Sequence, residues 1–437
     1  MNEMMSCKRI FLFGLVLFVL LGSLCVVLVD AEPSWVLWSQ TYGGTEDDGQ
    51  FHLVYVVETP DGGFAVASNT ESFGAGSSDF WLIKTDASGN MEWNKTYGGT
   101  EFDVVYSLIL TSDGGFALAG LTGSFGTGNV DFWLVKTDSF GYLEWNQTYG
   151  GKGSDIAYSL VETSDGGYAL AGYSGSFGAG ESDFWLVKAD HYGNLEWNQT
   201  YGGANGDVAY SLVETSDGGF ALVGFTTSLG GDDADFWLVK TDESGNLEWS
   251  NLFGGEKADM AESLAQTSDG GYALVGTTES FASGWKECWL IKTDDHGNKE
   301  WDKTYGEENS DWAHSLILTS DGGFAIAGES DSFGAGGYDF WLIKTDSSGN
   351  IEWSRTYGGP ERDSAESVIQ TSDGGYVLAG LTQSYGLVGS DLNLKSDIWL
   401  VRTTEQGIPE FPSWTLLPLL IAATLVAIIY RKKLHNT

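Results

Sequence analysis

The stretch that decides the fold runs from residue 104 to residue 150 and reads VVYSLILTSDGGFALAGLTGSFGTGNVDFWLVKTDSFGYLEWNQTYG. Four segments within it, 104–111, 116–121, 131–137 and 143–148, are rich in β-branched and aromatic residues, which favour strands. Glycine-containing turns such as Asp113-Gly114-Gly115 separate the segments, because glycine accepts the positive φ angles of tight hairpins. The stretch therefore predicts a sheet of four short strands.

This unit recurs along the chain at a fixed spacing. An Asp-Gly-Gly-aromatic motif begins at every 52nd residue, at Asp61, Asp113, Asp165, Asp217, Asp269, Asp321 and Asp373. A Glu-Trp motif follows it in the fourth segment of six units, with its tryptophan at Trp93, Trp145, Trp197, Trp249, Trp301 and Trp353. Four short strands repeated seven times are typical of a β-propeller.

The fourth segment of the last unit lies at the other end of the repeat region. Residues 35–44 (WVLWSQTYGG) match a fourth strand, and Trp38 is the equivalent tryptophan. The N-terminal strand should then complete the last blade and close the ring, which leaves no open sheet edge. The sequence predicts an all-β protein with a seven-bladed propeller of four-stranded blades over residues 32–407.

The run WLIKTDASGNMEW at residues 81–93 resembles the tryptophan-docking repeat of quinoprotein-type propellers. The resemblance implies that Trp38, Trp93 and their equivalents lock adjacent blades, and we expect them to be buried there. The units also resemble those of secreted bacterial and archaeal repeat proteins. Quinoprotein dehydrogenases need eight blades and a calcium-bound quinone, so their active site is not carried over to seven units.

The two ends of the chain carry targeting signals. Residues 10–29 form an uncharged apolar run after Lys8 and Arg9, which predicts a signal peptide or signal anchor over residues 1–31. Residues 414–430 are 17 residues without a charge and precede a basic tail at 431–437. This pattern predicts a transmembrane helix whose tail stays in the cytoplasm, with the propeller on the extracellular side.

A short motif stands just before that helix. Residues 408–413 contain Pro409, Glu410, Phe411 and Pro412, and their order resembles the PEF-type C-terminal sorting signal of archaeal surface proteins. The resemblance implies cleavage by a membrane transpeptidase and transfer of the protein to a lipid. The alternative is a plain tail anchor with a proline-rich hinge.

Composition narrows the possible partners. The chain has 21 basic and 61 acidic residues and a net charge of −40, so we expect no nucleic acid as a partner. Of its three cysteines only Cys288 lies outside the N-terminal segment, which excludes an internal disulfide or a cysteine-based metal site in the propeller.

Two sets of polar residues recur at equivalent positions. Aspartates at the start of six innermost strands could circle one mouth of the channel and hold calcium: Asp103, Asp155, Asp207, Asp259, Asp311 and Asp363. The alternative is that each bonds to the backbone of its own loop. Asn94, Asn146 and Asn198 match the N-glycosylation pattern on the outermost strand.

No catalytic motif is present, so the sequence favours a binding or adhesion scaffold at the cell surface, with an extracellular protein or glycan as partner and no cofactor except possible calcium. The alternatives are a glycan-active lyase or hydrolase that uses the channel mouth and a structural envelope component. His314, beside Trp312, is the best single site candidate. A pocket with convergent acids and bases would favour the enzyme, whereas a symmetric aromatic face would favour binding.

Overall fold

The computed structural model describes residues 19–20, 23–24, 35–49, 53–231, 233–386 and 395–404. It separates into the unit Leu37–Gln406 and a second unit, Met1–Val36 with Gly407–Thr437. In the second unit, β1 (Val19–Leu20) and β2 (Ser23–Leu24) pair antiparallel. The predicted sorting motif and transmembrane helix lie outside the described residues, as does most of the predicted signal segment. No described helix is long and apolar enough to cross a membrane.

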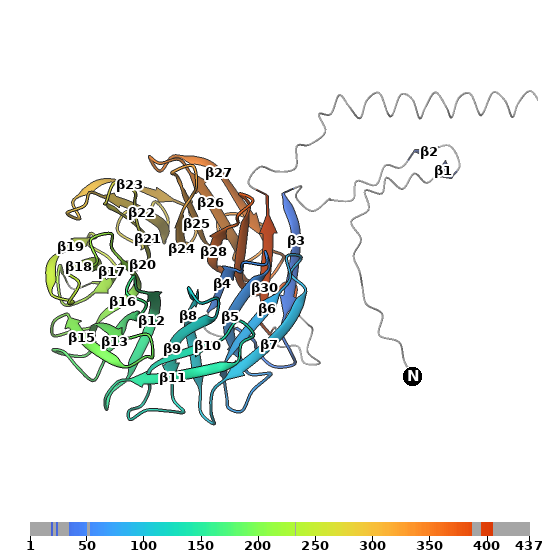
Figure 1. Ribbon diagram of the computed structural model, residues 1–437. Helices are drawn as coiled ribbons and strands as arrows, with labels where there is room; N and C mark the ends of the chain where they lie inside the picture. The colour runs from blue at the N-terminus through green and yellow to red at the C-terminus, as the bar shows by residue number, and fades with distance from the viewer. Residues whose placement is uncertain are drawn as a thin grey trace, which may run out of the picture. The chain divides into compact units, whose positions relative to one another are not determined.

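The larger unit is a ring of seven four-stranded antiparallel sheets around a central channel (Figure 1). The first strand of each sheet lies nearest the channel: β4 (Val54–Glu58), β8 (Asp103–Leu110), β12 (Asp155–Glu162), β16 (Asp207–Glu214), β20 (Asp259–Gln266), β24 (Asp311–Leu318) and β28 (Asp363–Gln370). The second strands are β5 (Phe64–Thr70), β9 (Phe116–Thr122), β13 (Tyr168–Ser174), β17 (Phe220–Thr226), β21 (Tyr272–Thr278), β25 (Phe324–Ser330) and β29 (Tyr376–Thr382).

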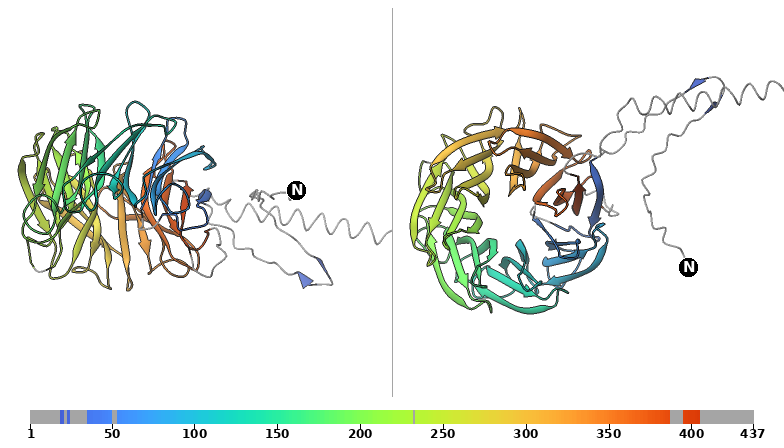
Figure 2. Two further views of the ribbon diagram at one scale, coloured as in Figure 1. Left: turned by 90° about the horizontal axis from the view of Figure 1, so that it is seen from below. Right: turned by 45° about the horizontal axis from the view of Figure 1, so that its top comes forward.

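The outer half of each sheet completes the blade, and the views in Figure 2 show the blades side by side around the ring. The third strands are β6 (Asp79–Thr85), β10 (Asp131–Thr137), β14 (Asp183–Ala189), β18 (Asp235–Thr241), β22 (Glu287–Thr293), β26 (Asp339–Thr345) and β30 (Asp397–Thr403). The fourth strands are β7 (Met91–Tyr97), β11 (Leu143–Tyr149), β15 (Leu195–Tyr201), β19 (Leu247–Phe253), β23 (Lys299–Tyr305), β27 (Ile351–Tyr357) and β3 (Val36–Tyr42).

Ring closure follows the prediction. The last sheet has the strand order β28-β29-β30-β3, so the N-terminal strand supplies its outermost strand. Two hydrogen bonds then tie β3 to the first blade: Tyr42 Oη donates to the carbonyl of Gly89 at 2.5 Å, and Trp38 Nε1 donates to the carbonyl of Ala87 at 3.2 Å. The seven-bladed propeller is therefore confirmed.

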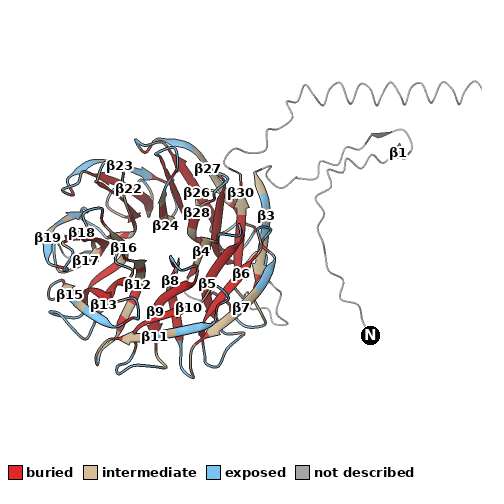
Figure 3. Ribbon diagram, in the orientation of Figure 1, coloured by how far each residue is buried: buried red, intermediate tan, exposed pale blue. Residues whose placement is uncertain are grey.

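The core lies between neighbouring blades. Second and third strands are buried along almost their whole length, whereas the fourth strands face solvent on one side (Figure 3). Five third-strand tryptophans pack on an aromatic ring of the preceding blade, as Trp185 does on Phe132 with ring centroids 4.5 Å apart. The other two, Trp81 and Trp341, share a core cluster with Ile398 and Cys288 of the preceding blade instead. Strands buried on both faces explain why these segments read as continuous apolar runs.

The fourth-strand tryptophans differ from the expectation of full burial. Trp197 packs beside Phe220 of the next blade, with ring centroids 5.8 Å apart, and lies against Gly245 in that blade's turn. Trp197 and its six equivalents are nevertheless only half-buried. The reason is their place on the outermost strand, where one side of the ring meets the next blade and the other meets solvent.

A buried lysine braces each of the first six blades. Lys84 Nζ forms ion pairs with Asp61 at 2.9 Å and with Glu92 at 3.1 Å, and it donates to the carbonyl of Thr85. The same arrangement recurs at Lys136, Lys188, Lys240, Lys292 and Lys344. The Asp-Gly-Gly motif is thus a hairpin turn that also supplies the counter-ion of a buried ammonium.

One blade lacks a hydrogen bond that its neighbours have. Trp185 Nε1 donates to Asn198 Oδ1 at 3.1 Å, and Trp81 and Trp133 are satisfied in the same way. The equivalent residue in the fourth blade is Ser250, and Trp237 Nε1 has no hydrogen-bond partner among the described residues.

We expect Ser250→Asn to raise the free energy of unfolding by about 1 kcal/mol, because it supplies the missing acceptor. Chemical denaturation of the propeller measures this change. Ser354→Asn is the matched control and should give no gain, since Ser354 Oγ already accepts from Trp341 Nε1 at 2.7 Å. An unchanged Ser250→Asn protein would contradict the expectation.

The central channel as candidate functional site

The inner strands carry a bulge that sets the lining of the channel. In six blades the register of the first strand against the second shifts at one residue, for example between Val105 and Ser107. A bulge adds one residue to a strand and redirects its side chain. The bulged residues are Tyr106, Tyr158, Tyr210, Glu262, His314 and Glu366.

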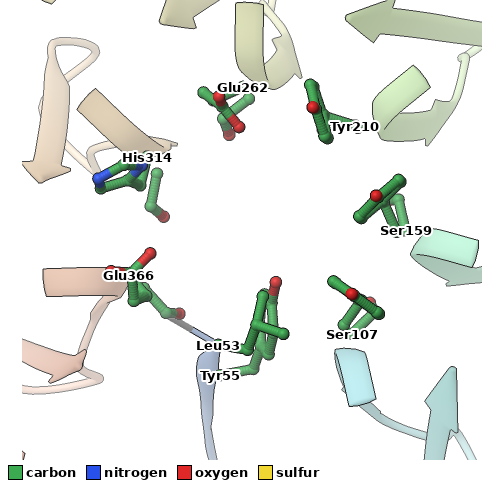
Figure 4. A pocket seen from close by; sticks show the side chains of 14 residues that line it. Leu53, Tyr55, Ser107, Ser159, Tyr210, Glu262, His314 and Glu366 are labelled. Carbon is green, nitrogen blue, oxygen red and sulfur yellow. The ribbon is translucent and has the colours of Figure 1, made fainter. Parts of the chain in front are cut away.

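These bulged side chains surround a cavity of about 460 Å³ in the channel (Figure 4). The serine after each bulge also lines it, and the first blade, in which β4 pairs with β5 without a register shift, contributes Leu53 and Tyr55 instead. Cavities of this size commonly hold small ligands.

The cavity is asymmetric although the fold is repetitive. Four consecutive blades present tyrosine rings, Tyr55, Tyr106, Tyr158 and Tyr210. Tyr158 stands edge to face with Tyr106 at 4.7 Å and with Tyr210 at 4.9 Å between ring centroids. The remaining three blades present Glu262, His314 and Glu366. The channel therefore has an aromatic wall and an ionisable wall.

Burial and mutual charge shift the pKa values of the ionisable wall. Burial raises the pKa of Glu262 to about 7, and the nearby Glu366 carboxylate adds to that rise, although His314 opposes it. Burial by itself would lower the pKa of His314, but the carboxylates of Glu366, Glu329 and Glu262 outweigh it and the pKa is raised. Perturbed groups gathered in one cavity are typical of functional sites.

A hydrogen bond positions one member of this wall, and an ion pair lies near another. Ser364 Oγ donates to Glu366 at 2.6 Å. Behind His314, the buried Glu329 carboxylate accepts two hydrogen bonds from the Arg362 guanidinium, at 2.6 and 2.9 Å. His314 Nε2 is buried and has no hydrogen-bond partner among the described residues. One nitrogen of the imidazole thus has no hydrogen-bond partner within the described part of the chain.

The six predicted aspartates occupy a different place from this cavity. All six are fully buried, and their oxygens accept hydrogen bonds from their own loops. Asp103 accepts from the backbone N–H of Gly99 at 2.8 Å and from the hydroxyls of Ser124 and Thr122. Calcium binding at this ring stays a prediction, and a cation would have to replace these existing contacts.

The structure adds a seventh aspartate to the set. Asp48 accepts hydrogen bonds from the backbone of Gly44 and from the hydroxyls of Ser72 and Thr70, as Asp103 does in the next blade. Tyr42 and Asp61 are 19 residues apart, against 16 for the equivalent Tyr97 and Asp113, so the first unit carries three extra residues. They follow Asp48, and the fixed spacing therefore concealed this aspartate. The last unit carries six extra residues, since Trp341 and Trp399 are 58 residues apart instead of 52. Residues 50–52, near the first insertion, and residues 387–394, near the second, lie outside the described residues.

Six of these aspartates, all except Asp48, lie beside an acidic residue of the preceding blade. A Cβ atom added to Gly98 would lie within 3 Å of both Asp79 Oδ1 and Asp103 Oδ2, so the two carboxylates share a space that only glycine leaves open. Burial and the neighbouring Asp363 raise the pKa of Asp339 to about 6, against its hydrogen bond from Ala335. The pKa values of Asp79, Asp183 and Asp235 are raised too, again chiefly by burial.

These shifts predict an unfolding free energy that peaks at mildly acidic pH. Carboxyl groups whose pKa is raised by folding bind more protons in the folded state than in the unfolded state. The free energy of unfolding therefore increases as pH falls from about 7 to about 4. Hydrogen bonds to Thr59 and Lys84 lower the pKa of Asp61 to about 2, so its contribution is lost as pH falls toward about 2. Thermal unfolding measured across this pH range checks the prediction. Asp339→Asn should reduce the increase in stability between about pH 7 and about pH 4, because it removes a carboxyl group with a raised pKa. A stability that only increases up to neutral pH would contradict it.

The predicted glycosylation residues lie on the outer surface. Asn94, Asn146 and Asn198 are exposed on β7, β11 and β15, and each Oδ1 accepts from a buried tryptophan. Modification of their amide nitrogens stays a prediction. Among the described residues the acidic and histidine side chains close enough for one metal ion are Asp294, Asp295 and His296, in an exposed turn.

Sequence reasoning found one member of the ionisable wall, His314, and missed Glu262, Glu366 and the tyrosines. The signal that could have found them is the residue before the serine of each inner strand. Comparison of the repeats at that single position gives tyrosine three times and then glutamate, histidine and glutamate.

Comparisons with known proteins give the following relations. No protein-family model matches the chain. Over 251 residues, 51% of the chain, it is 25% identical to the regulatory protein FlaEY of Caulobacter vibrioides. The match spans about a quarter of that protein, 26% of its length.

Several solved structures are similar to this chain at low sequence identity. Sqt1 from Chaetomium thermophilum is 12% identical, with 86% of this chain and 100% of that chain covered and a TM-score of 0.46. The Pan2 WD40 domain of Neurospora crassa is 10% identical, with 81% and 89% covered and a TM-score of 0.49. The phage phi92 endosialidase is 11% identical, with 86% and 70% covered and a TM-score of 0.48. Because these TM-scores are all below 0.5, the fold is assigned from the strand pairing of this chain alone.

Proposed function

We propose that this chain is a membrane-tethered, extracellular binding propeller whose ligand site is the central channel. The observation that carries the proposal is the break in repeat symmetry at the channel, where Glu262, His314 and Glu366 replace the tyrosines of the other blades. Structural positions such as the buried lysines and the loop aspartates repeat around the ring. A scaffold without a ligand has no need for a different lining in three blades.

The tether is proposed from the sequence at the C-terminus. The uncharged segment 414–430 and its basic tail support a single membrane-spanning helix, and the motif at Pro409–Pro412 supports sorting to the cell surface. Membrane fractionation of the full chain and of a chain ending at residue 407 tests this part. The full chain should sediment with membranes and the shortened chain should not.

A binding screen tests the proposed site. Residues 32–407 contain all seven sheets and the core between them, so this piece carries its own fold. We expect it to bind a member of a panel of glycans and cell-envelope extracts, and the variant Glu262→Gln/His314→Gln/Glu366→Gln to bind at least about tenfold more weakly. Equal binding by both proteins would place the ligand elsewhere.

A second function is favoured by one observation. Glu262, with a pKa of about 7, is able to donate a proton near neutral pH, and Glu366 lies in the same cavity wall. A pair of carboxyl groups is the machinery of glycoside cleavage. New reducing ends or unsaturated sugars released from the panel, and lost with Glu262→Gln, would support a glycan-active enzyme. Bound but unaltered glycan would support binding alone.

A further inference from the structure

The cavity has walls of complementary chemistry and lacks basic residues with a permanent charge. The 14 described residues that line it include four tyrosines, two glutamates and one histidine, and neither lysine nor arginine is among them. An anionic ligand would lie beside two carboxyl groups, and a single imidazole would be the only group able to offset their negative charge. The lining thus disfavours negatively charged ligands.

We propose that the cavity binds an organic ammonium ion, with its positive charge between the Glu262 carboxylate and the faces of the tyrosine rings. This inference rests on the proposed function, because it names the ligand class of the same site. The geometry that supports it is the placement of Tyr210 and Glu262 on adjacent blades, at the junction of the aromatic and ionisable walls (Figure 4).

Charge balance favours one positive charge. Glu262 and Glu366 supply two carboxyl groups, and His314 supplies one imidazole, so the wall has one acidic group in excess. Glu262 lines the cavity half-buried, and burial is the main cause of its raised pKa, so its charged form is costly without a partner of opposite charge. A monovalent cation beside it would neutralise the wall. The net charge of −40 further concentrates cations around the propeller.

The aromatic wall favours an organic cation over a metal ion. Tyrosine faces attract cations through the ring quadrupole, and clustered rings are a known means of recognising quaternary ammonium groups. Glu262, His314 and Glu366 all lie in the described part of the chain, and their ligand atoms are not all within 4.8 Å of one another. A metal ion needs such a group, whereas an ammonium ligand several ångströms wide can span the cavity.

Binding should depend on pH through Glu262. The groups that face this carboxyl are His314 on β24, Glu366 on β28, Tyr210 on β16 and Tyr55 on β4. The pKa values of both tyrosines are raised, chiefly by burial, so they stay neutral. Deprotonation of Glu262 and of His314 therefore sets the net charge of the ionisable wall. Both steps make the wall more negative as pH rises, which favours binding of a cation.

Calorimetric titration of residues 32–407 with choline chloride, and separately with ethanolamine hydrochloride, tests the inference. We expect binding of at least one probe, and an affinity that rises roughly 30-fold between about pH 5.5 and about pH 8.5 as Glu262 ionises. Glu262→Gln should lower the affinity at least about tenfold and remove most of the pH dependence. Tyr210→Leu should also weaken binding. Choline and ethanolamine carry one positive charge each and distinguish a quaternary from a primary ammonium ligand.

The control is Glu243→Gln, which removes the same charge from an exposed turn and should leave binding unchanged. The absence of heat with both probes, or equal heat from the wild type and Glu262→Gln, overturns the ammonium assignment. Heat from a neutral sugar that is lost in Glu262→Gln also overturns it, but leaves the channel as the ligand site. If the triple channel variant binds the ligand found in the screen as tightly as the wild type, the proposed function itself is contradicted, which is a different result from the loss of the ammonium assignment.

Discussion

Removal of strand β3 is expected to lower the free energy of unfolding of the propeller by at least about 5 kcal/mol and its melting temperature by about 10 °C or more. The strand buries Tyr42 in the cluster that joins the last blade to the first, and half-buries Trp38. It also supplies the hydrogen bonds of these side chains to Gly89 and Ala87. Without it, β30 becomes an open edge and the ring loses its closure.

Thermal unfolding of residues 45–407 beside residues 32–407 measures this effect. Deletion of residues 32–34 alone is the matched control, since it leaves β3 whole, and it should change the melting temperature little. If the piece that begins at residue 45 melts with the intact propeller, β3 does not close the ring.

The second large effect is expected from the third-strand tryptophans. Trp185 is 2% exposed, and its ring packs on Phe132 of the preceding blade. Trp185→Ala should cost about 3–5 kcal/mol, because it leaves a cavity in a core that joins two blades. It also leaves Asn198 without its indole donor. Equilibrium denaturation in urea measures the loss.

Trp197→Ala is the informative comparison. Its ring is half-buried on the outermost strand, so truncation should cost about 2 kcal/mol, which is less than at Trp185. The far-ultraviolet spectrum of both variants should stay that of the intact sheets. A larger loss at Trp197 than at Trp185 would mean that the docking tryptophans, and not the buried third strands, dominate the stability of the blade interfaces.

The local structure of the blades could be read from the sequence because each strand is short, apolar and bounded by a glycine turn. The segments predicted in the second unit end within one residue of β8, β9, β10 and β11. Closure by β3 was also predictable, since the missing fourth strand of the last unit stood at the start of the chain.

Three features needed the structure. Half-burial of Trp197 depends on how far the next blade covers the outer strand, which periodicity does not encode. Asp48 was concealed by an insertion that breaks the spacing after it. The channel lining depends on a bulge that turns Glu262 and its equivalents inward, and a simple strand alternation does not place that residue.

The central claim is that the channel is a ligand site with its charge-binding position beside Glu262. The measurement that tests it most directly is a crystal structure of residues 32–407 grown with choline. We expect electron density for the ligand inside the channel, with its ammonium group between the Glu262 carboxylate and the ring of Tyr210. Water alone in the channel, with choline bound on the outer surface or absent, would contradict it.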